Sequence, residues 1–356
     1  MVFSLQIFRK TDVIGLDIGS NSVKLIHLAP TKKGWKMVKM GLIHLPPEAI
    51  VDGSIIDSMT VINAVKGLIA EQGIKIKSTV SALTGHSVII KKVNLPVMSD
   101  AELAESIQWE AEQYIPFPIA DVNMDFQILG ADTEGRGQME VMLVAVKKDV
   151  INDYTNVIKE AGLIPVVVDV DSFALENMFE LNYAVGPNEN IAMVNIGATI
   201  TSINILRGGI TIFTRAIPLG GNQFTEEIQK VLGISFKDAE TAKLGGEVSG
   251  IDAGGIPQIL EKVCGNVAVE VKRSIDFFLG SAPGMFISKI YFGGGCAKTK
   301  GLSASIQEKT AIPVEMLNPF AHIECNPKKF TPEYLKEIAP YFTVGVGLAM
   351  RRVGDK

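Results

Sequence analysis

Cysteine and histidine are scarce in this chain, and their spacing argues against two common kinds of site. The three cysteines, Cys264, Cys296 and Cys325, lie far apart without the Cys-x-x-Cys spacing that is typical of zinc sites. An odd and sparse set of cysteines indicates reduced thiols in the cytoplasm and not a disulfide framework. The four histidines are scattered, so we expect solvated or core imidazoles and no metal cluster.

The sequence also lacks long apolar runs and blocks of basic residues. No run approaches the roughly 18 apolar residues that a membrane-spanning helix needs. The net charge is −5 without a basic cluster, so nucleic acid is not an expected partner. A chain of 356 residues, 47% hydrophobic and 21% charged, is typical of a globular protein with about two domains. The apolar segment at residues 1–10 is expected to fold against the first domain, with a weak membrane or partner contact as the alternative.

A polar, glycine-bearing turn between two apolar runs is the most informative stretch of the chain. Residues 13–24 read Val-Ile-Gly-Leu-Asp-Ile-Gly-Ser-Asn-Ser-Val-Lys, which predicts a β-hairpin. Consecutive N–H groups in such a turn form a nest for phosphate oxygens. Lys24 would neutralise their charge, and Asp17 would hold Mg2+ through water molecules. The predicted phosphate-contacting tip is Gly19, Ser20, Asn21 and Ser22, although an ordinary tight turn is the alternative for this stretch alone.

The same pattern returns in the second half of the chain. Strands are predicted at residues 191–196 and 201–206, joined by the turn Gly197-Ala198-Thr199. The first Asp-Ile-Gly-Ser becomes Asn195-Ile-Gly-Ala, so the second hairpin begins its turn with an amide. An internal repeat of this kind predicts two related lobes whose tips face one cleft.

Two further segments are candidates for the same cleft. A strand at residues 287–292 is followed by Gly293, Gly294 and Gly295, which would let the backbone approach a flat ligand closely. A plain turn is the alternative there. A helix at residues 236–244 carries Glu240 and Lys243, for which a solvated face with an ion pair is the alternative.

Residues 86–165 follow a β-α-β-β-α-β pattern and look like an inserted module. Ser99 and Glu102 have the spacing of a capping box at the start of its first helix, residues 101–114. No catalytic constellation is present, but a sheet edge or apolar groove here could take an extended peptide by strand addition. The remaining chain divides into a first lobe of residues 1–85, 166–190 and 342–356, and a second lobe of residues 191–341.

The ordered set of motifs resembles the actin-like ATPase superfamily. Asp17-x-Gly19-Ser20-x-x-x-Lys24 and Asn195-x-Gly197-x-Thr199 are similar to its first and second phosphate loops, and Phe292-Gly293-Gly294-Gly295 to its adenosine loop. Ala239-Glu240-x-x-Lys243 resembles the segment that meets ribose and adenine in the cell-division protein FtsA. Gly345-x-Gly347-Leu348-Ala349 resembles the second connecting helix. The implied fold class is α/β, an actin-like two-lobed ATPase fold with a duplicated ribonuclease H-like core and an FtsA-type inserted subdomain.

Within that superfamily the whole chain resembles the PilM family of type IV pilus assembly proteins, most clearly at residues 17–24, 114–119 and 239–243. The resemblance implies a cytoplasmic scaffold, peripheral at the inner membrane, that binds ATP or ADP with Mg2+. It implies the N-terminal cytoplasmic peptide of PilN and the pilus motor ATPases as partners, with membrane contact only through PilN. A homo-oligomer is possible under this resemblance and is neither required nor excluded by it.

The implied nucleotide site has one departure from the superfamily pattern. Asn195 replaces the usual Asp of the second phosphate loop, and an amide stabilises a charged transition state less than a carboxylate. We therefore expect a nucleotide binder or a slow ATPase, with no catalytic residue identified; an FtsA-like filament former and a small-molecule kinase are the alternatives. The implied cofactor-binding residues are Asp17 (also the metal ligand), Gly19, Ser20, Asn21, Ser22, Lys24, Asn195, Gly197, Ala198, Thr199, Gly220, Glu240, Lys243, Gly293, Gly294 and Gly295.

Overall fold

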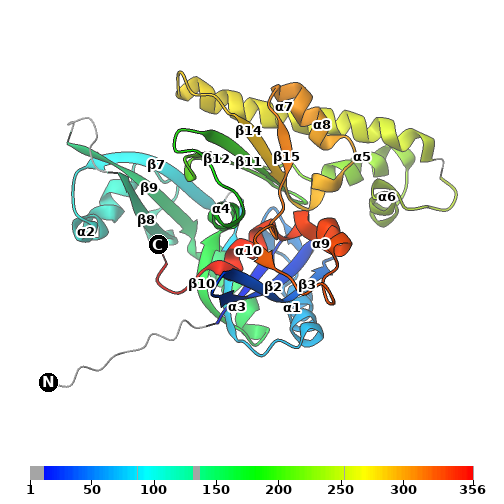
Figure 1. Ribbon diagram of the computed structural model, residues 1–356, viewed down its shortest axis with the longest axis horizontal. Coiled ribbons are helices and arrows are strands. Elements are labelled where there is room, and N and C mark those ends of the chain that lie inside the picture. Colours follow the sequence, from blue (N-terminus) through cyan, green and yellow to red (C-terminus); the bar gives the residue numbers. More distant parts are fainter. Residues whose placement is uncertain (1–11, 86, 131–136, 252, 356) are drawn as a thin grey trace.

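The computed structural model describes residues 12–85, 87–130, 137–251 and 253–355, so the expectation for residues 1–10 lies outside them. Two mixed sheets with helices against them form two lobes, and a small three-stranded sheet projects to one side (Figure 1). None of the helices in these ranges combines the length and hydropathy that a membrane crossing requires.

The first sheet has the strand order β10-β6-β1-β2-β3-β16. Its first two strands in the sequence, β1 and β2, form the predicted hairpin, with Asp17 directly opposite Lys24. Strands β6 and β10 run parallel to β1, so the three strands end at the same edge of the sheet as the hairpin tip. The bounds are β1 Ile14–Ile18, β2 Ser22–Thr31, β3 Gly34–His44, β6 Ser78–Leu83, β10 Ile164–Val170 and β16 Ile323–Glu324.

The second sheet repeats this arrangement in the order β13-β12-β11-β14-β15. Asn195 and Ser202 take the cross-strand positions of Asp17 and Lys24 in the first hairpin. The two turns close with equivalent bonds, because the N–H of residue 19 bonds the carbonyl of residue 22 and that of residue 197 the carbonyl of residue 200. The predicted internal repeat is therefore present. The bounds are β11 Asn190–Ile196, β12 Thr201–Arg207, β13 Ile210–Ile217, β14 Lys289–Gly293 and β15 Val314–Met316.

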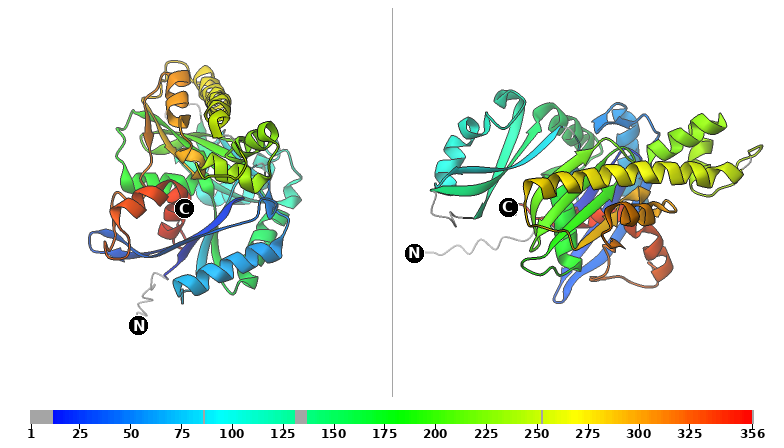
Figure 2. Two further views of the ribbon diagram at one scale, coloured as in Figure 1. Left: turned by 90° about the vertical axis from the view of Figure 1, so that its right-hand side faces the viewer. Right: turned by 90° about the horizontal axis from the view of Figure 1, so that it is seen from above.

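Helices cover the outer faces of both sheets and fill the space between them. Helix α1 starts at the Asp57 cap and ends at Gly73 in the left-handed region. Helix α7 runs along the second sheet (Figure 2), and α4 packs against α10 between the lobes. Gly347 permits that contact, since a Cβ there would lie 1.7 Å from the Ala174 carbonyl. The bounds are α1 Ser58–Gln72, α4 Asp171–Asn182, α5 Asn222–Leu232, α6 Phe236–Lys243, α7 Ile256–Ser281, α8 Leu302–Thr310, α9 Pro332–Ile338 and α10 Thr343–Met350.

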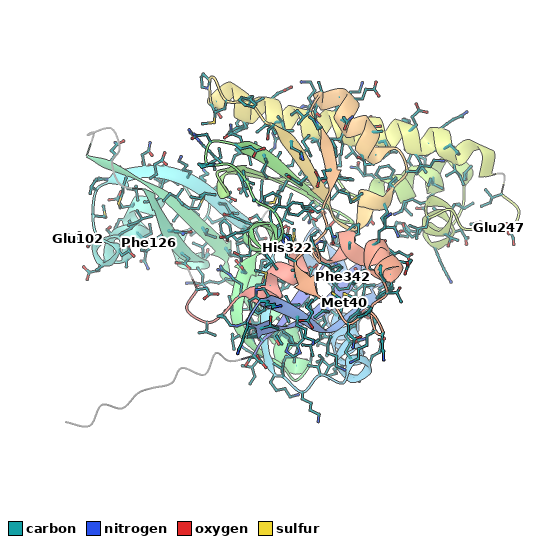
Figure 3. The ribbon with its side chains drawn as sticks, in the orientation of Figure 1. Met40, Glu102, Phe126, Glu247, His322 and Phe342 are labelled. Carbon is teal, nitrogen blue, oxygen red and sulfur yellow. The ribbon has the colours of Figure 1, made fainter. Side chains whose placement is uncertain are left out.

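The projecting module is smaller than the sequence predicts. Its sheet has the order β7-β9-β8, and α2 covers one face with the predicted capping box between Ser99 and Glu102. Figure 3 shows Glu102 on the side of the module far from the lobes. Helix α2 ends at residue 111, before the predicted residue 114. The bounds are β7 Val88–Pro96, α2 Asp100–Ala111, β8 Val122–Gly130 and β9 Gln138–Lys147.

The predicted module boundary at residue 165 is wrong. Helix α3 (Lys148–Glu160) buries Tyr154, Val157 and Ile158 in the core under the first sheet, and β10 pairs with β6. The local pattern of strands and helices shows where elements lie but not which sheet a strand joins. Both elements therefore belong to the first lobe, and the three-stranded sheet with α2 occupies residues 88–147.

The predicted end of the second lobe at residue 341 also needs correction. Strand β16 pairs with β3, and Phe320 and Phe330 pack with Met40 in a core shared with the first sheet. Figure 3 shows Met40 close to Phe342 in this region. The sequence does not predict α8, α9 or the shortest elements: β4 Ile50–Val51, β5 Ser54–Ile55, and the 3-10 helices η1 Ile119–Asp121, η2 Ala253–Gly255, η3 Gly295–Lys298 and η4 Ala339–Phe342.

Candidate functional site

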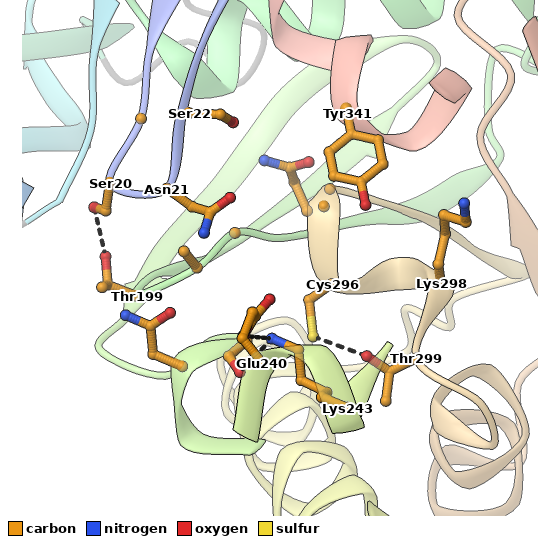
Figure 4. Close-up of a pocket in the computed structure, with 18 of the residues that line it drawn as sticks. Ser20, Asn21, Ser22, Thr199, Glu240, Lys243, Cys296, Lys298, Thr299 and Tyr341 are labelled. Atoms are coloured by element: carbon orange, nitrogen blue, oxygen red, sulfur yellow. Dashed lines mark hydrogen bonds and ion pairs between the residues drawn. The ribbon is translucent and has the colours of Figure 1, made fainter. Parts of the chain in front are cut away.

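A cavity of about 740 Å³ lies between the two sheets, and both hairpin tips face into it (Figure 4). We call residues 17–24 the first tip and residues 195–202 the second tip. The two tips touch, because Ser20 Oγ and Thr199 Oγ1 are 2.9 Å apart although 179 positions separate them. All the site residues predicted from the sequence line this cavity except Gly220 and Gly293. These two glycines pack behind lining residues, Gly220 against Ala198 and Gly293 against Thr343. The roles of all the predicted site residues toward a ligand remain predictions.

The first tip carries a balanced pair of charges. Lys24 Nζ lies 3.2 Å from Asp17 Oδ2, and both side chains are largely buried. The same Nζ is the nearest atom to the position that a side chain on Gly19 would take. The tip is also tied to the end of β3, since Asn21 Oδ1 lies 3.1 Å from His44 Nδ1. A cation is thus already held beside the N–H groups of the turn.

The second tip carries no charge and is held by backbone hydrogen bonds from the segment that precedes and begins α5. The N–H of Gly221 donates to the Gly197 carbonyl at 2.9 Å, and that of Asn222 to the Ala198 carbonyl at 2.8 Å. Gly220 is required for this contact, since a Cβ there would lie 2.6 Å from the Ala198 oxygen. The Asn195 amide is also engaged, because its Oδ1 accepts a bond of 3.2 Å from Thr343 Oγ1.

The glycine loop after β14 and helix α6 form the other end of the cavity. Gly294 has a φ of +92°, and a Cβ there would lie 2.3 Å from the Ile196 oxygen, so only glycine fits. Lys243 Nζ lies 2.6 Å from Glu240 Oε2 and donates to Thr225 at 3.0 Å. The ion pair offered as the alternative for this helix is present, and it forms part of the cavity wall.

Asp171 is a cavity residue that the sequence analysis missed. Its carboxylate accepts bonds from Thr84 at 2.8 Å and from Ser202 at 2.7 Å. Burial raises the pKa of Asp171, and the nearby Asp17 charge raises it further. Its position in the sequence could have predicted this place in the cavity. Asp171 directly follows β10, and the parallel strands β1, β6 and β10 all end at the edge of the sheet that carries the first tip. The site therefore does hold a second carboxylate near the tips.

The described residues contain no group of three or more acidic, histidine or cysteine side chains arranged to hold a metal ion. Asp17 and Asp171 are close enough to affect each other electrostatically, and both line the cavity. Mg2+ in proteins commonly uses one or two carboxylates together with phosphate oxygens and water. This donor set fits Mg2+ that arrives with a phosphate ligand and does not fit a cage of protein ligands.

A family model described as type IV pilus assembly protein PilM matches residues 15–353. This chain belongs to the PilM family. A solved structure described as a PilM–PilN type IV pilus biogenesis complex is 30% identical to it, with a TM-score of 0.87. The match covers 97% of this chain and 100% of the PilM-family chain in that structure.

More distant relatives place this PilM-family chain in the actin-like ATPase fold. Cell division protein FtsA of Bacillus subtilis (strain 168) is 24% identical over 257 residues, which are 65% of this chain and 57% of FtsA. The chain spans about half the length of the curated relatives that it matches. MreB5 of Spiroplasma citri bound to ADP has a TM-score of 0.51 at 15% identity, covering 92% of this chain and 98% of its own. At that identity the likeness concerns the fold alone.

Proposed function

We propose that this chain binds an adenine nucleotide, ATP or ADP, with Mg2+ in the cavity between its lobes. The observation that carries the proposal is the meeting of the two tips at one cavity through Ser20 and Thr199. The first tip offers N–H groups and the Lys24 ammonium to phosphate oxygens. Asp17 would hold Mg2+ through water, and the ion would add positive charge to the phosphate end of the site.

Slow hydrolysis, or none, fits the remaining residues. Asn195 is neutral and already accepts a bond from Thr343. Asp171 is the one carboxylate besides Asp17 that we assign to the phosphate end, and two hydroxyl groups hold its orientation. A raised pKa makes it a better proton acceptor than an ordinary Asp. We propose it as the residue that would orient a water molecule, while the missing charge at position 195 keeps turnover low.

We further propose that the protein is a scaffold for the N-terminal cytoplasmic peptide of PilN. Support comes from the family and from the similar solved PilM–PilN complex. Among the strands that the structure describes, β8 lies at one edge of the module sheet and β10 at one edge of the first sheet. An extended peptide can add to either edge through main-chain hydrogen bonds. Attachment to the inner membrane would then be indirect, and the link to motor ATPases is carried by the resemblance alone.

Calorimetric titration with the PilN peptide, with and without Mg-ATP, tests both parts together with an assay of released phosphate. We expect saturable binding of the peptide, none of a scrambled peptide, and very little phosphate release. Lys24→Met separates the parts, since it should weaken ATP binding and leave peptide binding without ATP unchanged. Absence of any ATP binding would overturn the nucleotide proposal, and rapid turnover would overturn the proposal of slow hydrolysis. Equal binding of the scrambled peptide would overturn the scaffold proposal.

A further inference from the structure

One aromatic ring lies at the end of the cavity away from the tips. Tyr341 lines the cavity beside Gly295, Cys296 and Lys298, whereas the Ser20–Thr199 contact closes the opposite end (Figure 4). Among the described lining residues, the other aromatic side chain is the imidazole of His44, which lies at the first tip. The two ends of the cavity therefore differ in chemistry.

The backbone around Tyr341 holds its ring against the glycine loop. The N–H of Gly294 donates to the carbonyl of Pro340, the residue before Tyr341, at 3.0 Å. A Cβ on Gly295 would lie 3.1 Å from Cε1 and 3.2 Å from Cδ1 of the ring. The glycine thus lets the ring approach the loop more closely than a side chain there would permit. The Tyr341 ring therefore packs directly against the glycine loop.

The walls around this ring suit a flat ring system with a polar edge. Apolar side chains of α6 and the start of α7 line the same cavity, and Lys298 Nζ lies 3.6 Å from Glu337 Oε1 at its side. Burial raises the pKa of Tyr341 above the ordinary value for tyrosine. The apolar lining residues at the end of α6 and the start of α7 are Ala242, Leu244, Ile256, Pro257 and Leu260.

We infer that Tyr341 is the residue on which the nucleotide base stacks, and that it makes the site prefer purines to pyrimidines. This inference rests on the proposed nucleotide function. Aromatic rings attract the faces of bases, and a purine offers more stacking area than a pyrimidine. Tyr341 packs with the core shared with the first sheet, while Gly295 follows β14 of the second. The base would therefore be held between both lobes, as the phosphates are between both tips.

Titration of wild-type protein, Tyr341→Ala and Tyr341→Phe with Mg-ATP, Mg-CTP and inorganic triphosphate tests the inference. We expect Tyr341→Ala to weaken ATP binding roughly tenfold or more, from the usual effect of losing one stacked base. Its affinity for triphosphate should match the wild type, and its preference for ATP over CTP should shrink. Tyr341→Phe keeps the ring and should bind ATP nearly as the wild type does.

The outcomes separate this inference from the proposal beneath it. If wild-type protein binds neither ATP nor triphosphate, the nucleotide function itself fails. If ATP binds and Tyr341→Ala has no effect, or loses ATP and triphosphate equally, only the stacking inference fails. Proton NMR of ATP bound to wild-type protein gives an answer that needs no variant. A ring stacked on Tyr341 shifts the adenine H2 and H8 signals upfield, and unshifted signals would overturn the inference even if Tyr341→Ala did not fold.

Discussion

The two hairpin tips have the same backbone and different electrostatics. Each turn closes with an equivalent hydrogen bond, and each places a polar residue opposite a polar partner across the strands. In the first hairpin that pair is Asp17 and Lys24, joined by an ion pair of 3.2 Å. In the second hairpin it is Asn195 and Ser202, whose side chains bond Thr343 and Asp171 instead of each other.

This difference shows that the two copies of a repeated hairpin can have different roles in one ligand site. The first tip holds the charges that phosphate and Mg2+ would meet. The second tip is neutral. Its carbonyl groups at residues 197 and 198 accept hydrogen bonds from residues 221 and 222, and Gly220 packs closely against them. We therefore expect loss of the charges in the first hairpin to alter ligand affinity, and disruption of the packing at residues 220–222 to alter stability.

The largest expected effect is that of Lys24→Met on nucleotide affinity. Loss of a hydrogen bond to a charged group costs about 1.5–3 kcal/mol, which corresponds to roughly 10–150-fold weaker binding of Mg-ATP. Ser202→Ala changes the equivalent position of the second hairpin and should alter the affinity no more than about threefold, since the Ser202 hydroxyl bonds the Asp171 carboxylate and is not assigned a contact with the phosphates. Calorimetry measures the affinity of both variants for Mg-ATP. Equal losses of affinity would contradict the proposal that the two hairpins have different roles.

Gly220→Ala tests the close packing of Gly220 against the second tip. Its Cβ would lie 2.6 Å from the Ala198 carbonyl oxygen, which is backbone and cannot turn away. Overpacking of this kind costs about 1–3 kcal/mol of the free energy of unfolding. Gly19→Ala is the matched control, since its nearest neighbour is the flexible Lys24 ammonium at 3.1 Å. Urea unfolding should show a clear loss for Gly220→Ala and a smaller one for Gly19→Ala; the reverse order would contradict this account.

The Ser20–Thr199 contact joins the two tips and should slow nucleotide release. Ser20→Ala removes one neutral hydrogen bond, worth about 0.5–1.5 kcal/mol, so we expect release about 2–10-fold faster. Stopped-flow measurement with a fluorescent ATP analogue reports this rate. Thr199→Ala should have the same effect, and the double variant should add nothing further. Fully additive effects would show that the two hydroxyls act separately.

Asp171 lines the cavity and accepts bonds from Thr84 and Ser202, and its pH dependence is the smallest effect that we expect. Burial raises its pKa above the ordinary value of 3.8, so the folded state binds this proton more tightly than the unfolded state. The stabilising contribution of protonated Asp171 to the free energy of unfolding is fully present at pH values below 3.8. It is lost as the pH rises through the raised pKa. Asp171→Asn should therefore melt near the wild-type temperature at low pH and above it at neutral pH. A difference that does not change with pH would refute the assignment.

Most elements were predictable because their causes are local. The hairpins follow from an Asp-x-Gly turn and an Asn-x-Gly turn between apolar runs, α1 from its apolar spacing between Asp57 and Gly73, and the start of α2 from its capping box. The repeat at residues 195–199 was visible for the same reason. The motifs in order were also enough to indicate the PilM family, which the family model confirms.

Only the tertiary structure decided which distant segments meet. Strand β10 and helix α3 join the first sheet and not the module, because long-range pairing with β6 and burial under β1 determine their place. Asp171 and Tyr341 reach the cavity from segments that carry no turn motif. The sequence determined the two tips through local turn chemistry, whereas the cavity and its carboxylate and aromatic walls arise from contacts between residues far apart in the chain.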